Sequence, residues 1–235
     1  MKWGWIAVAA ALMAGPVAAD DLTIRTTFTF QAALDALIGP YEAASGDKVK
    51  IAAQGQPADL ILLLKAQFEP LLKDGSVDAK SVADFGQVRV GFAVKAGAPV
   101  PDISTPEKFK AALLAAKSVG VSGFTSGLFV KNEVFPKLGI ADAMKDKTTV
   151  VNGAIGEGVA KGQVEVGFQQ MSELLPIKGI TVAGRIPEDV NRATILTSGL
   201  GSHNKAPAAA NRFIAYMKSP AGLAILKQLD IEPVK

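Results

Sequence analysis

Short apolar runs alternate with amphipathic runs along most of this chain. Leu60 to Leu64 is a continuous apolar run of strand length, which is typical of a parallel strand buried on both faces. An amphipathic run over 34–41 comes before it and predicts a helix that closes at Ser45-Gly46. This alternation predicts an α/β protein with mostly parallel sheets flanked by helices. Strands are predicted over residues 22–25, 48–53, 60–64, 88–95, 119–121, 148–151, 164–169, 180–183 and 194–197.

One strand-to-helix turn is rich in glycine and hydroxyl side chains. The apolar run Val119 to Val121 stops at a turn, and an amphipathic run follows to Leu138. The free backbone N–H groups at the start of such a helix favour an anion, and nearby hydroxyls add donors. The alternative is that the turn only caps the helix. The candidate ligand-binding residues of this turn are Ser122, Thr125, Ser126 and Gly127.

A second polar turn follows the first predicted strand, which ends at Arg25. The residues of the turn are Thr26, Thr27, Phe28 and Thr29, and its three threonines are candidates for ligand binding. If Arg25 reaches a ligand, its planar guanidinium favours a carboxylate or a phosphate by bidentate pairing. The alternative is a surface arginine at a strand end.

Three further strand ends supply candidate polar groups. Gln54 and Gly55 follow the predicted strand over 48–53, while Asn152 and Gly153 follow the one over 148–151 and either line a ligand site or only turn the chain. Gln169 and Gln170 end another strand and point in opposite directions, so at most one of them faces a ligand.

The order of the elements predicts two α/β lobes. The chain can cross between lobes only near 96–100 and near 185–193. Lobe I is therefore predicted over 20–94 plus 194–235, and lobe II over 95–193. Because ligands of open α/β sheets bind at the carboxyl ends of strands, two facing lobes predict a ligand cleft between them.

Residues 1–19 have the pattern of a cleaved signal peptide. Lys2 is followed by an apolar core, and Val17-Ala18-Ala19 supplies the small residues that precede a cleavage site. The alternative, a membrane anchor, needs about 20 apolar residues, and this stretch is shorter. No cysteine is present to take a lipid. We therefore expect export to the periplasm without a lipid anchor.

The composition disfavours several classes of function. The formal charge of +3 is too small to indicate nucleic-acid binding, and the lack of cysteine excludes disulfides and thiolate metal sites. His203 is the only histidine, and no nucleophile elbow or Walker A pattern is found. Carboxylates such as Glu173 are scattered and are expected at the surface. We therefore predict no enzyme, no cofactor and no metal site.

Four segments match one family in order and spacing. The first matching segment is Leu22-Thr23-Ile24 with the polar turn and helix that follow it. The second is Gln56-Pro57-Ala58-Asp59-Leu60, which is like the family's GxPADV segment. The segment over 162–167 is like its GEADAGI strand, and Lys218-Ser219-Pro220-Ala221-Gly222 is like its SPEGQ helix start. Over essentially the whole mature chain, the sequence resembles the periplasmic solute-binding proteins of ABC importers, in the branch that contains molybdate-binding proteins.

The resemblance implies a two-lobed periplasmic-binding-protein fold of type II, with the ligand in the cleft between lobes. It implies a monomer that captures a small anion, an oxyanion such as molybdate or a small carboxylate, and delivers it to a membrane permease. The alternatives are a periplasmic ligand-sensing module, or a hydrolase or transferase on the same two-lobe scaffold.

The resemblance also implies which residues bind the ligand. The family's first serine hydroxyl falls on Thr29, the alanine of its PAD segment on Ala58, and its strand-to-helix turn on 124–127. The chain departs from the family in two places. A GSSG-type turn and its helix look deleted after Gly55, and the pocket tyrosine falls near Gln170. Both departures favour a ligand other than plain molybdate.

Overall fold

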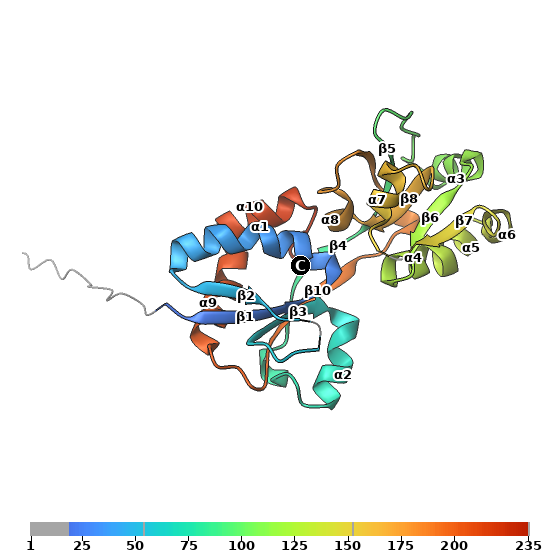
Figure 1. Cartoon of the computed structure of the whole chain (residues 1–235). Helices are drawn as coiled ribbons and strands as arrows, with labels where there is room; N and C mark the ends of the chain where they lie inside the picture. The colour runs from blue at the N-terminus through green and yellow to red at the C-terminus, as the bar shows by residue number, and fades with distance from the viewer. Residues whose placement is uncertain (1–18, 54, 152, 235) are drawn as a thin grey trace, which may run out of the picture.

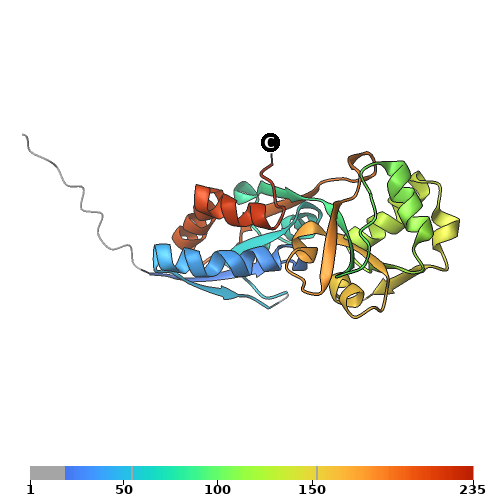
Figure 2. The same cartoon turned by 90° about the horizontal axis from the view of Figure 1, so that it is seen from above.

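The computed structural model describes residues 19–53, 55–151 and 153–234. The predicted signal peptide, apart from Ala19, and the candidates Gln54 and Asn152 lie outside these ranges. Two lobes are visible in Figure 1, each with a sheet and flanking helices. The view from above in Figure 2 shows the lobes side by side. No helix in the described part of the chain combines the length and the apolar character that crossing a membrane requires.

The sheet of lobe I has five strands in the order β2-β1-β3-β10-β4. β1 pairs in parallel with β2 and β3, whereas β10 is antiparallel to β3 and β4. Four strands therefore run in one direction and β10 runs against them. The strands are β1 Asp21–Thr26, β2 Lys48–Ile51, β3 Leu60–Leu64, β4 Ala83–Val88 and β10 Thr194–Leu200.

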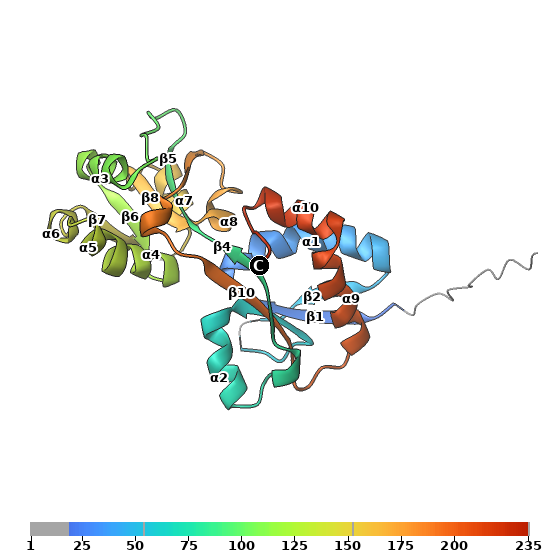
Figure 3. The same ribbon diagram turned by 180° about the vertical axis from the view of Figure 1, so that it is seen from behind.

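Both faces of this sheet are covered, which explains the apolar run of β3. One face packs against α1, α9 and α10 through a core that includes Leu62, Phe30 and Phe213. The other face packs against α2 through Ile61 and Phe68. Figure 3 shows α9 and α10 beside α1. The helices are α1 Phe28–Ser45, α2 Phe68–Lys73, α9 Pro207–Lys218 and α10 Pro220–Gln228, with short 3-10 helices Lys65–Gln67 and Ala79–Ser81.

The sheet of lobe II repeats the same topology, in the order β7-β6-β8-β5-β9. β5 is antiparallel to β8 and β9, while β6 is parallel to β7 and β8. The strands are β5 Val90–Lys95, β6 Val119–Ser122, β7 Thr148–Val151, β8 Val166–Gln170 and β9 Ile180–Arg185. The helices are α3 Pro106–Ala115, α4 Thr125–Phe129, a π-helix Val130–Val134, α5 Phe135–Lys137, α6 Ala141–Met144, α7 Ile155–Ala160, α8 Met171–Leu174 and a 3-10 helix Glu188–Val190.

The chain leaves lobe I between β4 and β5 and returns at β10. The strand predicted over 88–95 is in fact the end of β4 and the whole of β5, which lie on either side of Arg89 and belong to different sheets. The predicted limit at residue 94 therefore placed β5 in the wrong lobe. The sequence held no signal for the break, because Val88 and Val90 are both buried and continue one apolar alternation. In each sheet, the strand that runs against the others is the one that follows a passage of the chain between the lobes. This strand is β10 in lobe I and β5 in lobe II.

The lobes also touch at α8. This short helix follows β8 of lobe II and packs against α1 of lobe I. Met171 is part of the core of lobe I, and the Ser172 hydroxyl donates a hydrogen bond to the Thr29 carbonyl oxygen over 2.8 Å. The start of α1 and the end of β8 are thereby held together beside the space between the lobes.

Candidate functional site

A cavity of about 650 Å³ lies between the lobes, at the carboxyl ends of β1, β3, β6 and β8. Nine of the predicted site residues line it, from both lobes. Lobe I contributes Arg25, Thr26, Thr27, Thr29 and Gly55, and lobe II contributes Ser122, Thr125, Ser126 and Gln170. Phe28, Phe124 and Glu173 also line the cavity, and the sequence analysis did not choose them as site residues. Both polar turns therefore face one space.

Three predicted residues are absent from the lining of this cavity. Ala58 lines a smaller pocket on lobe I, and Gly153 is an exposed turn residue with φ of 108°. Gly127 is buried, and its N–H donates to the Ser122 hydroxyl over 3.2 Å. A Cβ atom at Gly127 would lie 1.9 Å from the Ser122 carbonyl oxygen. This glycine is therefore required for close packing of α4 on β6, and the prediction that it contacts ligand is not supported by its position.

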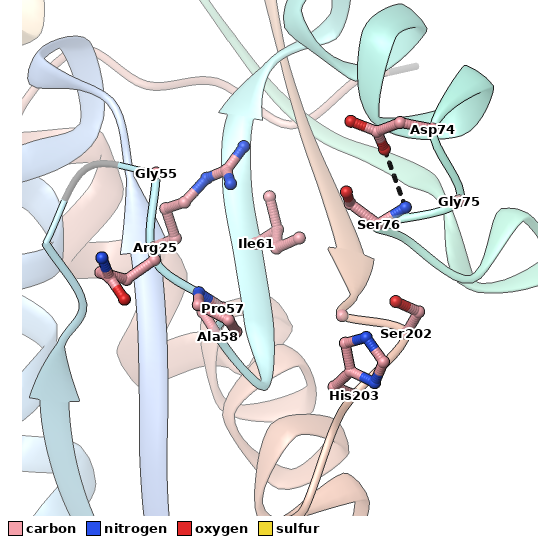
Figure 4. Close-up of a pocket in the computed structure, with 12 residues that line it drawn as sticks. Arg25, Gly55, Pro57, Ala58, Ile61, Asp74, Gly75, Ser76, Ser202 and His203 are labelled. Carbon is pink, nitrogen blue, oxygen red and sulfur yellow. Dashed lines mark hydrogen bonds between the residues drawn. The ribbon is translucent and has the colours of Figure 1, made fainter.

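Arg25 lines the cavity from the face of the sheet opposite Ile24. Alternation along β1 places Ile24 in the core under α1, so Arg25 projects on the face of Ile61 and α2. Figure 4 shows the guanidinium over β3 beside Ile61, and Asp74 lies on the other side of Ile61. Arg25 forms no hydrogen bond or ion pair with another described residue. Its charge contributes to lowering the pKa of Asp74, after the larger contribution of Ser76.

The hydroxyl groups of the cavity are only partly engaged. Thr27 is the N-cap residue of α1, but its side chain makes no capping hydrogen bond, and the first turn of this long helix holds no acidic residue. In lobe II the hydroxyl oxygens of Ser122 and Ser126 lie 3.3 Å apart and are both buried. These hydroxyls and the open amides at the start of α1 are donors available to an anion.

Gln170 and Gln169 point to opposite sides of β8, as the alternation predicts. Gln169 accepts a hydrogen bond from the Ile155 N–H over 2.9 Å, whereas Gln170 lines the cavity. Gln170 Nε2 lies 2.8 Å from the Thr194 hydroxyl, and its buried Oε1 has no partner among the described residues. A rotated amide would accept from Thr194 and leave its NH2 group for a ligand, because the two ends have the same shape.

Glu173 is the only carboxylate among the described residues that line the cavity. The Thr29 hydroxyl donates to its Oε1 over 2.7 Å, across the contact between the lobes. Burial raises the pKa of Glu173 to about 7, although hydrogen bonds from Thr29 and Gln169 act in the opposite direction. The expectation of a surface glutamate is therefore wrong. The sequence does show that Glu173 lies three residues after the end of β8, where a side chain can reach the cavity. The apolar pattern did not reveal the short helix α8 on which Glu173 lies.

His203 lies outside the cavity between the lobes. It lines the smaller pocket of about 170 Å³, with Ser202, Asp74 and Arg25 (Figure 4). Among the described residues, no hydrogen bond joins His203 to a serine or an aspartate, and no group of three or more possible metal ligands is found. The arrangement expected of a nucleophilic triad is thus not formed in the described part of the chain.

Comparisons with known proteins agree with this architecture. The aconitate isomerase of a Pseudomonas species is 30% identical over an alignment of 240 positions, which covers 95% of this chain and 91% of the relative. The periplasmic molybdate-binding protein of Azotobacter vinelandii superposes with a TM-score of 0.73 at 17% identity, over 91% of this chain and 100% of the other. PEB3 of Campylobacter jejuni with bound L-phospholactate gives a TM-score of 0.70 at 14% identity, over 90% and 99% of the two chains.

The family model described as "Bacterial extracellular solute-binding protein" matches residues 22–228, nearly all of the described chain. The solved structures, which are less than 25% identical, show the two-lobed fold. The resemblance stated from the sequence motifs is thereby confirmed. This chain belongs to the bacterial extracellular solute-binding protein family, with the fold of the molybdate-binding type.

Proposed function

We propose that this protein binds a small polycarboxylate in the cavity between its lobes, in the periplasm, and delivers it as a monomer to the permease of an ABC importer. The observation that supports this most is Arg25. It is the only cation among the described residues lining the cavity, and it has no anionic partner there within hydrogen-bonding distance. A guanidinium pairs with a carboxylate through two parallel hydrogen bonds.

Several features favour a polycarboxylate over a bare oxyanion. Molybdate sites in the resembling branch use hydroxyls and N–H groups without a cation, whereas this cavity adds an arginine. Its volume of about 650 Å³ falls within the range of roughly 300–1,000 Å³ that holds small organic ligands. The names of two related proteins point to small organic acids, since one is an aconitate isomerase and one structure contains L-phospholactate, which carries one carboxylate and one phosphate.

Two exposed aromatic side chains support closure of the lobes over the ligand. Phe28 of lobe I is 57% exposed and Phe124 of lobe II is 65% exposed, and both line the cavity. Closure would bury them and exclude water. Exclusion of water strengthens each charged hydrogen bond to the ligand.

Chemical conversion of the ligand is a second candidate function. A buried carboxyl with a pKa near neutrality is unfavourable in a site that only binds anions, yet Glu173 lies in this cavity. The related protein named as an isomerase supports this candidate. A periplasmic sensor that binds the same ligand remains an alternative to transport.

A thermal-shift screen tests the proposed binding. The panel contains cis-aconitate, trans-aconitate, other di- and tricarboxylates, molybdate, sulfate and phosphate. A ligand that binds only the folded state raises the melting temperature. We expect polycarboxylates to raise it, Arg25→Ala to abolish the rise, and Arg25→Lys to restore only part of it because lysine lacks the planar fork.

The matched control for this screen is Lys108→Ala. It removes one positive charge from an exposed site on α3, outside the cavity. A shift with molybdate alone would refute the proposed ligand class. An equal loss of binding in Lys108→Ala and Arg25→Ala would show that net charge, and not Arg25, governs binding.

A further inference from the structure

Glu173 adds negative charge to a cavity that otherwise presents donors and one cation. A carboxylate beside a bound anion costs free energy unless it is protonated or serves another purpose. Thr29 fixes its orientation through the hydrogen bond to Oε1 over 2.7 Å, and the same threonine is anchored by Ser172. The carboxyl is therefore held in one place in the lining of the cavity, at the contact between α1 and α8.

We propose that Glu173 is a catalytic acid–base group that moves a proton along a bound unsaturated polycarboxylate and so shifts its carbon–carbon double bond. This inference rests on the proposed binding of a polycarboxylate at Arg25. The substrate class is an alkene polycarboxylate with a CH2 group between the double bond and a carboxylate. Aconitate is such a compound, and it is the substrate in the name of the 30% identical relative.

The reaction needs one group that both takes and returns a proton. The Glu173 carboxylate removes a proton from the CH2 group, and the electron pair of that C–H bond spreads over the three-carbon allyl unit and its carboxylates. Glu173 then returns a proton, either the same one or one exchanged with solvent while the carboxyl holds it, to the carbon at the other end of the allyl unit. One C–H bond breaks and one forms, the double bond moves by one position, and Glu173 regains its starting state. No oxidant, metal or other reactant is consumed.

The surroundings of Glu173 suit this exchange. The hydroxyl of Thr29 stabilises the carboxylate form, while burial stabilises the protonated form, so that both forms are present near neutral pH. Arg25 lines the same cavity and can stabilise the negative charge that develops on the ligand. The charged residues on the elements packed against α8 are Asp35, Glu42, Lys95, Glu157 and Arg185, and none of them lines the cavity.

Exchange of the ligand's CH2 hydrogens with solvent deuterium tests the inference. The mature protein is incubated with cis- or trans-aconitate in D2O, and proton NMR follows the loss of the CH2 signal and the appearance of the other isomer. We expect wild-type protein to catalyse both, and Glu173→Gln to bind the ligand with affinity within a few-fold while its exchange falls at least about 100-fold. The matched control is Glu157→Gln, an exposed glutamate on α7 that lies outside the cavity.

The outcomes separate this inference from the proposed binding. Binding with neither exchange nor isomerisation above that in buffer would overturn the acid–base role and leave the binding function intact. Exchange that persists in folded Glu173→Gln would overturn it too. No binding of any polycarboxylate would refute the proposed function itself. Recovery of exchange in Glu173→Ala on addition of formate would support the role independently, because a small carboxylate can replace the missing group but not a structural side chain.

Discussion

Glu173 gives the most quantitative prediction for stability. Burial raises its pKa from an ordinary value of 4.5 to about 7. Between these two values the folded protein holds more protons at this site than the unfolded chain does, so the free energy of unfolding falls as the pH rises. The loss is complete above pH 7. One pKa unit corresponds to about 1.4 kcal/mol, so the whole shift corresponds to about 3 kcal/mol.

Replacement of Glu173 by glutamine removes this cost while keeping the size of the side chain. Because water reaches part of Glu173, we expect a gain of about 1–3 kcal/mol in Glu173→Gln at pH 8 relative to wild type. Near pH 4.5 the two proteins should differ little, since the carboxyl is protonated in the folded state. Urea unfolding at both pH values measures the difference, and other titrating groups cancel in the comparison.

The control for this experiment is Glu157→Gln, which changes an exposed carboxylate paired with Lys161. It should show no gain in stability at pH 8. The same difference between Glu173→Gln and wild type at both pH values would refute the argument that burial in the cavity shifts the pKa of Glu173. It would also remove one support for the acid–base role.

Three further predictions follow from the contacts around the cavity. Thr29→Ala should raise the pKa of Glu173 further, because the carboxylate loses a hydrogen-bond donor. Carbon NMR titration of the side-chain carboxyl measures the pKa, and an unchanged pKa would contradict the role of this hydrogen bond. Gly127→Ala should destabilise the protein by about 1–3 kcal/mol or more, because the added Cβ would collide with the backbone of Ser122. Gly39→Ala, whose added Cβ meets no atom within 4 Å, should be neutral or stabilising. Urea unfolding measures both, and equal effects would contradict the packing argument. Because a bound anion raises the pKa of Glu173, ligand binding should take up a proton near pH 7 to 8 and none at pH 5. Calorimetry in buffers of different ionisation enthalpy measures the proton uptake, and equal uptake at both pH values would contradict this prediction.

The fold was largely predictable because its signals are local. The apolar run of Leu60 to Leu64, the glycine that ends α1 and the Ser219-Pro220 start of α10 each act within a few residues. The switch between sheets at Arg89 was not predictable. It depends on which distant strands pair with β4 and β5, and the apolar pattern continues across the break.

The lining of the candidate site was predictable where it follows directly from the end of a strand. The turns after β1 and β6 both line the cavity, and both had been chosen for their hydroxyl side chains, the second for its glycines as well. Glu173 was missed because its burial comes from contact between α8 and α1, which are 144 residues apart at the Thr29 hydrogen bond. Gly127 looked like a ligand-binding residue, although its role depends on a backbone approach that the sequence does not reveal.

Calorimetric titration of the mature protein with a tricarboxylate and, separately, with molybdate tests the central claim most directly. We expect saturable binding of cis- or trans-aconitate at one site per chain, lost in Arg25→Ala and kept in Lys108→Ala. No heat of binding is expected with molybdate at the same concentrations. Tight binding of molybdate that is unaffected by Arg25→Ala, together with no binding of the tricarboxylate, would contradict the account.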